Sequence, residues 1–291
     1  MKIDTCLVRG LVSSQFPQWA GLPIKPVAPG GHDNRTFRLG QAMSVRLPSR
    51  ETYAAHVAVE HEWLPKLGPH LPLPIPVLLG KGRPSLEFPW PWSILSWILG
   101  ETASKDRIAD MVEFARRLAS FLNCLQSIDA TGAPVPGKHN FFRGGDLAVY
   151  DAETRESMDE LRDVIDRNAA AAAWEAALAE RFGRRPVWVH GDVADGNLLV
   201  KDGRLCGVID FGQLVAGDPS CDVTIAWTLF SGKSREAFRA ELAVDEGTRV
   251  RGRGWGLWKA LLQLRRHRSN DPRAAAKAER VICDILGERS P

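Results

Sequence analysis

The sequence predicts an α+β fold with two unequal lobes, a small strand-rich N-terminal lobe and a larger, mainly helical C-terminal lobe. Three observations lead to this prediction. Short apolar runs separated by Pro and Gly fill residues 1–98, which is typical of strands and turns. Apolar side chains then recur at helical spacing over 106–128. A chain of 291 residues also has the length of about two domains, so we expect lobes at 1–98 and 99–291.

The N-terminal lobe is expected to begin with a hairpin. The stretch "PIKPVAPGGHDNRTFRLG" reads as strand, turn and strand, with the turn at 30–34. A further strand, "AMSVRLP", ends at Pro48, and apolar spacing predicts a helix over 51–67. The run "SILSWIL" at 93–99 is expected to be a buried strand that leads into the C-terminal lobe.

The C-terminal lobe is expected to be built mostly from helices. The apolar period over 106–128 predicts the first of them, and a charged, alanine-rich helix or pair of helices follows over 151–182. Short strands occupy 187–212, and further helices run to the C-terminus. The glycines of "RGRGWG" at 251–256 do not have the GxGxxG spacing and follow no strand, so they do not indicate a dinucleotide site.

Composition narrows the class of protein. With 44% hydrophobic and 25% charged residues the chain has the balance of a soluble globular protein, and its net charge of +3 does not favour nucleic acid as a partner. The five cysteines show no CxxC spacing and are expected to be free thiols in a reducing compartment. No signal-peptide pattern and no apolar run near the ~20 residues of a membrane span are present. We therefore expect a cytoplasmic monomer or homodimer with no membrane partner.

The stretch "VWVHGDVADGNLLVKDGRLCGVIDFG" places polar residues where short strands begin and end. Asp192 follows one strand, Asn197 precedes the next, and Asp210 ends a third. If the last two strands form a hairpin through the turn at 201–204, Asn197 and Asp210 lie side by side. A carboxylate and an amide oxygen there suit Mg²⁺, which keeps positions for phosphate oxygens. Asp192 could then accept a proton from a hydroxyl nucleophile, and the set suits phosphoryl transfer.

Simpler interpretations exist for each of these residues alone. Asp and Asn are common turn formers, although the spaced set is poorly explained in that way. His190 is expected to hold the loop by a hydrogen bond and to be neither a base nor a metal ligand. Asp218 and Asp222 could brace the loop through backbone hydrogen bonds or contact a substrate. A metallohydrolase would need more histidine or carboxylate ligands than the sequence offers nearby.

The segments "HGDVADGNLLV" and "GVIDFGQLVAGDPSCDV" resemble the aminoglycoside phosphotransferase family, relatives of the protein kinases that phosphorylate small molecules. The HGD-x4-N loop, the metal-binding aspartate and the GDP-x2-D segment all have the family's spacing. The resemblance implies a protein-kinase-like fold, with Asp192 as the catalytic residue and Asn197 and Asp210 as the metal ligands. It also implies ATP, with GTP possible, and Mg²⁺ as cofactors.

The resemblance extends to the nucleotide side of the site. "VAPGGHDNRTFRLG" is similar to the family's nucleotide-covering hairpin, which implies that Gly30 and Gly31 approach the phosphates. Arg46 stands where the family usually has a phosphate-binding lysine, and arginine grips phosphate with a planar fork. Glu60 matches the acidic residue that pairs with this base, with Glu62 as the alternative if the register differs by a small shift.

The hinge of the family, whose backbone contacts adenine, corresponds to Ser96, Trp97 and Ile98. The arginine at position 46 leaves the choice between ATP and GTP open. In all, the resemblance covers roughly residues 24–260.

The acceptor is expected to be a small hydroxylated molecule. The segment 247–270 contains no acidic residue, although carboxylates precede it at Glu236, Glu241, Asp245 and Glu246. It carries the basic residues Arg249, Arg251, Arg253, Lys259, Arg265, Arg266 and Arg268. A solvated helix face explains these charges at least as well as a pocket lining. The balance still favours a neutral or anionic acceptor, such as a macrolide, a nucleoside-type antibiotic or a sugar-like metabolite, over a polycation.

The function expected from these features is antibiotic inactivation by phosphorylation. An alternative within the same chemistry is a metabolic kinase for a choline-, homoserine- or sugar-like acceptor. A nucleotide-binding pseudokinase is an alternative from a different class, although the intact Asp192, Asn197 and Asp210 argue against it. A metal-dependent hydrolase is a more distant one, and it would need no nucleotide.

Overall fold

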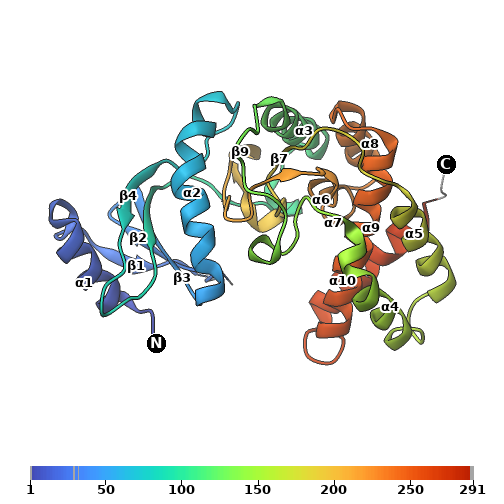
Figure 1. The fold of residues 1–291 in the computed structure, drawn as a ribbon, viewed down its shortest axis with the longest axis horizontal. Helices are drawn as coiled ribbons and strands as arrows, with labels where there is room; N and C mark the ends of the chain where they lie inside the picture. Colours follow the sequence, from blue (N-terminus) through green and yellow to red (C-terminus); the bar gives the residue numbers. More distant parts are fainter. Residues whose placement is uncertain (1, 29, 32, 289–291) are drawn as a thin grey trace.

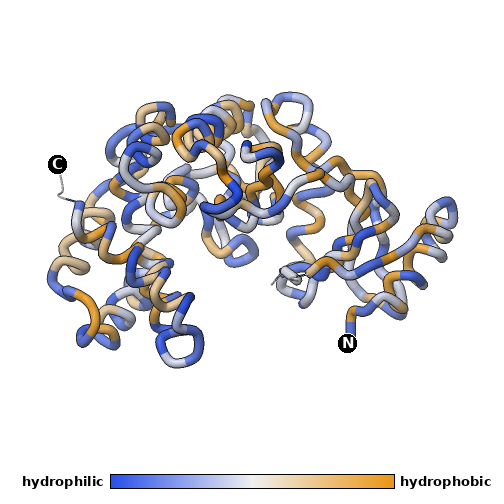
Figure 2. Tube along the Cα trace, turned by 180° about the vertical axis from the view of Figure 1, so that it is seen from behind, coloured by the Kyte–Doolittle hydropathy of each residue, from blue (hydrophilic) through white to orange (hydrophobic). Residues whose placement is uncertain are grey.

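The computed structural model describes residues 2–28, 30–31 and 33–288. Its fold is α+β, with a strand-rich N-terminal part and a mainly helical C-terminal part, as the sequence predicts (Figure 1). Hydrophobic stretches run along the strands and helices of both parts (Figure 2). No helix within the described ranges is long and apolar enough to cross a membrane.

The N-terminal part is a five-stranded antiparallel sheet in the order β1-β2-β3-β5-β4. Its strands are β1 (Ile24–Pro26), β2 (Asn34–Leu39), β3 (Met43–Pro48), β4 (Leu78–Gly82) and β5 (Trp92–Ser96). The hairpin of β1 and β2 and the strand that ends at Pro48 lie where the sequence places them. The helix α1 (Thr5–Gln15), which the sequence did not indicate, buries Val8, Leu11 and Val12 against this sheet.

The helix predicted over 51–67 is present as a 3₁₀ turn (Glu51–Tyr53) followed by α2 (Ala54–Leu67). In Figure 1, α2 stands between the sheet and the C-terminal part. Its last turns pack toward the C-terminal side, because Trp63 and Leu64 belong to the large core that the C-terminal helices share. Residue 46 on β3 and residue 60 on α2 are therefore brought close to the junction of the two parts.

The first C-terminal helix, α3 (Met111–Ser127), starts later than the predicted 106–128. The side chain of Asp110 accepts hydrogen bonds from the backbone N–H groups of Val112 and Glu113, so it caps the helix at that point. The alanine-rich segment forms a pair of helices, α4 (Asp151–Glu160) and α5 (Arg167–Ala179).

The remaining helices are α6 (Ser220–Val223), α7 (Ile225–Thr228), α8 (Gly232–Glu241), α9 (Glu246–His267) and α10 (Pro272–Leu286). The "RGRGWG" glycines lie inside α9, where they let neighbouring elements approach closely. A Cβ at Gly254 would lie 2.5 Å from the Cβ of Ala177, and one at Gly252 would lie 2.8 Å from the Cβ of Val223. These glycines therefore serve helix packing, which agrees with the absence of a dinucleotide motif.

Two small sheets lie between these helices and the N-terminal part. One pairs β7 (Val187–Val189) with β10 (Val215–Gly217), and the other has the order β6-β8-β9. Its strands are β6 (Glu101–Thr102), β8 (Leu198–Lys201) and β9 (Arg204–Val208). The hairpin between β8 and β9 turns through Asp202 and Gly203, both with positive φ. This is the hairpin that the sequence predicts, and it sets Asn197 beside Asp210.

Candidate active site

The loop that carries Asp192 is held in one backbone conformation. Gly191 has φ +85°, and a Cβ there would lie 2.6 Å from the carbonyl oxygen of Gln213, so no larger residue fits. The buried carboxylate of Asp222 accepts hydrogen bonds from the N–H groups of His190 (2.8 Å) and Gly191 (2.9 Å). Asp222 thus braces the loop through backbone hydrogen bonds and does not reach toward a substrate.

His190 has a structural role in this geometry. Its ring is fully buried and packs against Phe211, with 4.6 Å between the ring centroids. Nδ1 accepts a hydrogen bond from the N–H of Asp192 (3.2 Å), and Nε2 donates to the carbonyl oxygen of Ile209 (3.1 Å). With both nitrogens engaged, the imidazole ties the Asp192 loop to the residue before Asp210.

The three polar residues singled out from the sequence meet at this point. The side-chain amide of Asn197 donates to the backbone oxygen and to Oδ2 of Asp192, both at 2.9 Å. The backbone oxygen of Asn197 accepts from the N–H of Ile209 (2.9 Å). Asp210 follows with φ +69°, an uncommon conformation for a residue with a side chain. The side chains of Asp192 and Asn197 are therefore joined directly, and the backbone of Asn197 is joined to the residue before Asp210.

The donor set around Asn197 and Asp210 fits a hard divalent cation. The side-chain oxygen of Asn197 accepts no hydrogen bond from the residues that the structure describes, and the Asp210 side chain is one-third exposed. One carboxylate and one amide oxygen are hard ligands, and Mg²⁺ commonly uses few protein ligands of this kind. Asn197 and Asp210 are accordingly the residues that would hold such an ion.

Arg46 connects three elements at the junction of the lobes. Its Nη1 lies 2.8 Å from Glu60 Oε1, and its Nη2 lies 2.7 Å from Asp210 Oδ1. Glu60 Oε1 also accepts a hydrogen bond from the N–H of Phe211 (3.1 Å). Burial disfavours the charge, but the carboxylates of Glu60 and Asp210 outweigh it and raise the pKa of Arg46. Glu62 is not the partner, because it pairs with Lys66 on the exposed face of α2.

The turn expected to cover the phosphates lies between β1 and β2, with His32 outside the described residues. Gly30 and Gly31 are exposed and have no positive φ, and nothing in the described residues lies within 4 Å of a Cβ built at Gly30. The turn itself therefore does not require glycine at position 30, and both positions leave the backbone open to a ligand.

The three expected hinge residues differ in whether their backbone N–H groups are hydrogen-bonded. The N–H of Ser96 donates to the carbonyl oxygen of Val77, and the N–H of Trp97 donates to that of Ala42, both at 2.8 Å. Ile98 makes no such backbone hydrogen bond to the described part of the chain. Of the three, Ile98 is thus the position whose N–H is not already engaged.

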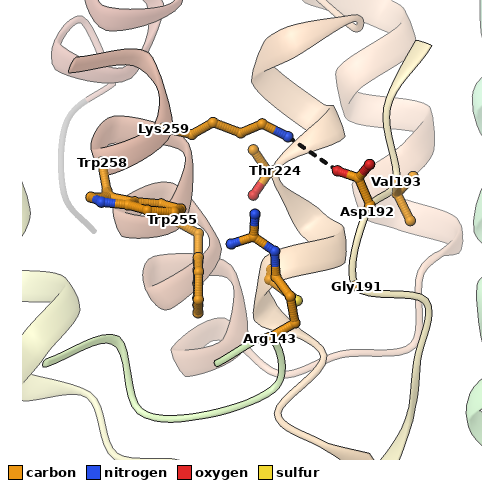
Figure 3. Close-up of a pocket in the computed structure, with 9 residues that line it drawn as sticks. Arg143, Gly191, Asp192, Val193, Thr224, Trp255, Trp258 and Lys259 are labelled. Carbon is orange, nitrogen blue, oxygen red and sulfur yellow. Dashed lines mark hydrogen bonds and ion pairs between the residues drawn. The ribbon is translucent and has the colours of Figure 1, made fainter. Parts of the chain in front are cut away.

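Beside Asp192 lies a hollow of about 260 Å³, part of which is open to solvent (Figure 3). Arg143 and Lys259 point into it, and the indole rings of Trp255 and Trp258 lie across from Asp192. Lys259 Nζ is 3.4 Å from Asp192 Oδ1. Burial would raise the pKa of Asp192, but Lys259 and Arg143 outweigh it and hold that pKa below its ordinary value.

The sequence did not single out Arg143, Trp255 or Trp258, and it gave Lys259 only as one of seven basic residues. The other six do not line the hollow, and neither do the four carboxylates between Glu236 and Glu246. The helical period of α9 was the signal that could have helped, since positions 255, 258 and 259 share one face of a helix. Nothing comparable marks Arg143, which lies in a loop.

Known proteins resemble this chain in sequence pattern and in fold. The sequence model described as "Phosphotransferase enzyme family" matches residues 24–261. None of the curated protein sequences that were compared matches the chain. The solved GDP and kanamycin complex of APH(2")-IIia is similar, with a TM-score of 0.72 and 17% identity over 96% of this chain and 97% of that one.

Two further solved structures share the fold. The streptomycin-ATP-APH(2")-IIa ternary complex has a TM-score of 0.58 and 19% identity, over 99% of this chain and 98% of that one. The macrolide 2'-phosphotransferase MphH from Brachybacterium faecium has a TM-score of 0.58 and 21% identity, over 99% of each chain. At these identities the similarity concerns the fold alone.

Proposed function

The chain belongs to the phosphotransferase enzyme family, and from that premise we propose that it transfers the γ-phosphoryl group of ATP to a hydroxyl group of a small molecule. The observation that carries this proposal is the network in which Asn197 joins Asp192 to the strand end before Asp210. It holds a base, an amide oxygen and a second carboxylate in fixed relation, which is what phosphoryl transfer by positioning requires.

On the acceptor side, Asp192 orients the hydroxyl and takes its proton. Its two backbone anchors, Asp222 and His190, keep the carboxylate in place without competing for that proton. The hydroxyl oxygen forms a bond to the γ-phosphorus while the bond from that phosphorus to the β-γ bridging oxygen breaks. ADP leaves with that oxygen, and the proton ends on Asp192.

On the nucleotide side, Arg46 binds the α- and β-phosphates and Glu60 steadies it. Gly30 and Gly31 cover the phosphates, and the backbone at Ser96, Trp97 and Ile98 forms the hinge against adenine, with Ile98 offering an N–H that is not bonded to any of the described residues. When bound at Asn197 and Asp210, Mg²⁺ would neutralise phosphate charge. The similarity to complexes with GDP and with ATP supports a nucleotide donor, and we take ATP as the donor and GTP as its competitor in the test.

This proposal assigns nucleotide binding to residues 1–98 and catalysis and acceptor binding to 99–291. We propose that the acceptor is an antibiotic, because the similar structures include kanamycin and streptomycin complexes and a macrolide 2'-phosphotransferase. A metabolic kinase is the second candidate, and the observation that favours it is the hollow beside Asp192. Arg143 and Lys259 line it beside Asp192, and this excess of positive charge suits a small anionic metabolite. A cytoplasmic location fits either role.

In the test, purified protein is incubated with Mg²⁺ and either ATP or GTP. A panel of aminoglycosides, macrolides, nucleoside antibiotics and small alcohols is then supplied as acceptors. ADP or GDP release and a phosphate-sized mass gain on the acceptor are followed. Asp192→Asn should lower turnover by about 10²–10⁴-fold while nucleotide affinity is unchanged, since the side chain acts on the acceptor proton. Asp195→Asn is the matched control, because Asp195 lies three residues on but pairs with Lys277. Equal losses in both variants would contradict the role of Asp192.

A further inference from the structure

The hollow beside Asp192 is positively charged. Its charged lining residues are Arg143, Lys259 and Asp192, so two cations face one carboxylate. The basic residues elsewhere on α9 do not produce this excess. Arg251, for example, is buried in a two-pronged pair with Asp218 (2.7 and 3.1 Å). The excess of positive charge is therefore local to the hollow and is not a property of the whole helix.

Arg143 is the cation with spare hydrogen-bonding capacity. Its Nε donates to Gln213 Oε1 (3.2 Å), and within the described part of the chain it makes no ion pair and its two terminal nitrogens make no hydrogen bond. Its guanidinium carbon lies 5.2 Å from the ring centroid of Trp255 and 5.3 Å from that of Trp258. The planar fork is thus held beside two aromatic rings with both donor ends free to meet an oxyanion.

The wall around Arg143 is fixed by contacts of its own. The backbone oxygen of Gly144 accepts a hydrogen bond from the N–H of Asp218 (2.8 Å), which fastens the Arg143 loop to the segment before α6. Trp258 donates from Nε1 to Glu153 Oε2 (2.9 Å), and Tyr150 stacks on its ring with 3.9 Å between centroids. The cation and the indoles are therefore in place before any ligand arrives, which lowers the entropic cost of binding.

A polycation would meet poor conditions in this hollow. Among the described residues that line it, Asp192 is the one carboxylate, and it already has Lys259 beside it at 3.4 Å (Figure 3). A positively charged acceptor would have to displace that lysine and approach Arg143 as well. An anionic group would instead find two cations, one of them with a free planar fork.

We propose that the acceptor carries an oxyanion, a carboxylate or a phosphate ester, near the hydroxyl that is phosphorylated, and that Arg143 and Lys259 bind this oxyanion. This inference rests on the proposed function, because it assumes that the hollow receives the acceptor. The hollow is partly open to solvent beside Asp192, so the anionic group enters it from the end of the acceptor that carries the reacting hydroxyl.

The test uses three compounds that differ only in charge: 4-(hydroxymethyl)benzoate, 4-(hydroxymethyl)benzamide and 4-(hydroxymethyl)benzylamine. Binding to the full-length protein with Mg²⁺ and ADP is measured by ligand-observed NMR, and phosphate transfer from ATP is measured separately by mass. We expect the acid to bind about tenfold more tightly than the amide, and the amide more tightly than the amine.

Variants show whether the two cations cause this order. Arg143→Gln and Lys259→Gln should weaken binding of the acid more than binding of the amide and so bring the acid-to-amide ratio toward one, and Arg143→Lys should restore part of the ratio. Arg265→Gln is the matched control: it removes a positive charge from α9 that pairs with Glu156 and Glu160 outside the hollow, and it should leave the ratio unchanged.

The outcomes separate this inference from the proposed function. If the acid binds no better than the amide, or if the ratio survives both Gln variants, the inference is wrong even where phosphate transfer to other acceptors occurs. Equal loss of turnover on all three compounds, with no change in ratio, would also overturn it and would assign the cations to the transferred phosphoryl group. If the acid preference depends on Arg143 but no acceptor of any class is phosphorylated, the proposed function fails and the anion site stands.

Discussion

Arg46 and Arg143 come from different parts of the chain, and each lies near an aspartate of the site, but their surroundings are opposite. Arg46 is nine-tenths buried and lies between Glu60 and Asp210, so protein carboxylates already satisfy its charge. Arg143 is only partly buried and has no carboxylate partner among the described residues. A cation that is satisfied internally supports the fold, whereas one that is left open is ready for a ligand that brings the opposite charge.

The contacts of Arg46 would have to change when a nucleotide binds as proposed. Asp210 is at once the partner of Arg46 and one of the two residues that would hold the metal ion. If the protein works as proposed, phosphate oxygens take the place of Asp210 beside Arg46, and the metal ion takes the place of Arg46 beside Asp210. The ion pair between Arg46 and Glu60 can remain. Arg143 needs no such exchange, because among the described residues its terminal nitrogens have no partner to release.

The largest effect on stability is expected at Arg46, whose charge is already satisfied by protein carboxylates. Arg46→Ala would leave Glu60 buried without a cation, since its remaining hydrogen bond comes from the N–H of Phe211. We expect the free energy of unfolding to fall by about 3–5 kcal/mol, as for the removal of one partner from a buried ion pair. Urea denaturation followed by tryptophan fluorescence measures this, because the chain has ten tryptophans.

The control for Arg46→Ala lies on the same helix as Glu60. Lys66→Ala removes the exposed pair with Glu62, in which both side chains are more than half exposed, and it should cost less than about 1 kcal/mol. If Arg46→Ala costs no more than this control, Arg46 is not the cation that stabilises the junction.

A much smaller effect on stability is expected for Arg143→Gln. No buried carboxylate loses a partner, and the losses are the contact with Gln213 Oε1 and the interaction with the indole rings. The free energy of unfolding should change by about 1 kcal/mol or less, measured as for Arg46. A loss as large as that of Arg46→Ala would mean that Arg143 also supports the fold, and the comparison between the two arginines would fail.

Local patterns in the sequence explain why the pairing of Arg46 with Glu60 could be predicted. Positions 57, 60 and 64 share one face of a helix, and Val57 and Leu64 are apolar, so the face that carries Glu60 is the buried one. Glu62 falls on another face. In the same way, the turn at 202–203 fixes the β8–β9 register, and this places Asn197 beside Asp210.

The acceptor side could not be predicted in this way, because no local pattern contains it. Arg143 lies in an irregular loop in which Phe141 and Phe142 adopt positive φ, and its place depends on tertiary contacts such as that of Gly144 with Asp218. Lys259 was visible in the basic segment, but its orientation depends on how the glycine-rich face of α9 packs against α5 and α6. These are contacts between distant parts of the chain, and no short pattern encodes them.

A further effect concerns acid, which should act on stability through His61 on α2, since arginine does not titrate in this range. His61 follows Glu60 on α2, and its Nε2 lies 2.9 Å from Ser93 Oγ. Burial, with the nearby charge of Lys81, lowers the pKa of His61 to about 4. In the unfolded chain His61 has a pKa of about 6.5 and therefore binds a proton more readily, so His61 lowers stability as the pH falls from about 6.5 toward 4.

We expect His61→Gln to reduce the slope of unfolding free energy against pH in this window, and the exposed His70→Gln to leave it unchanged. Identical slopes in wild type and His61→Gln would show that His61 does not cause the loss of stability in acid.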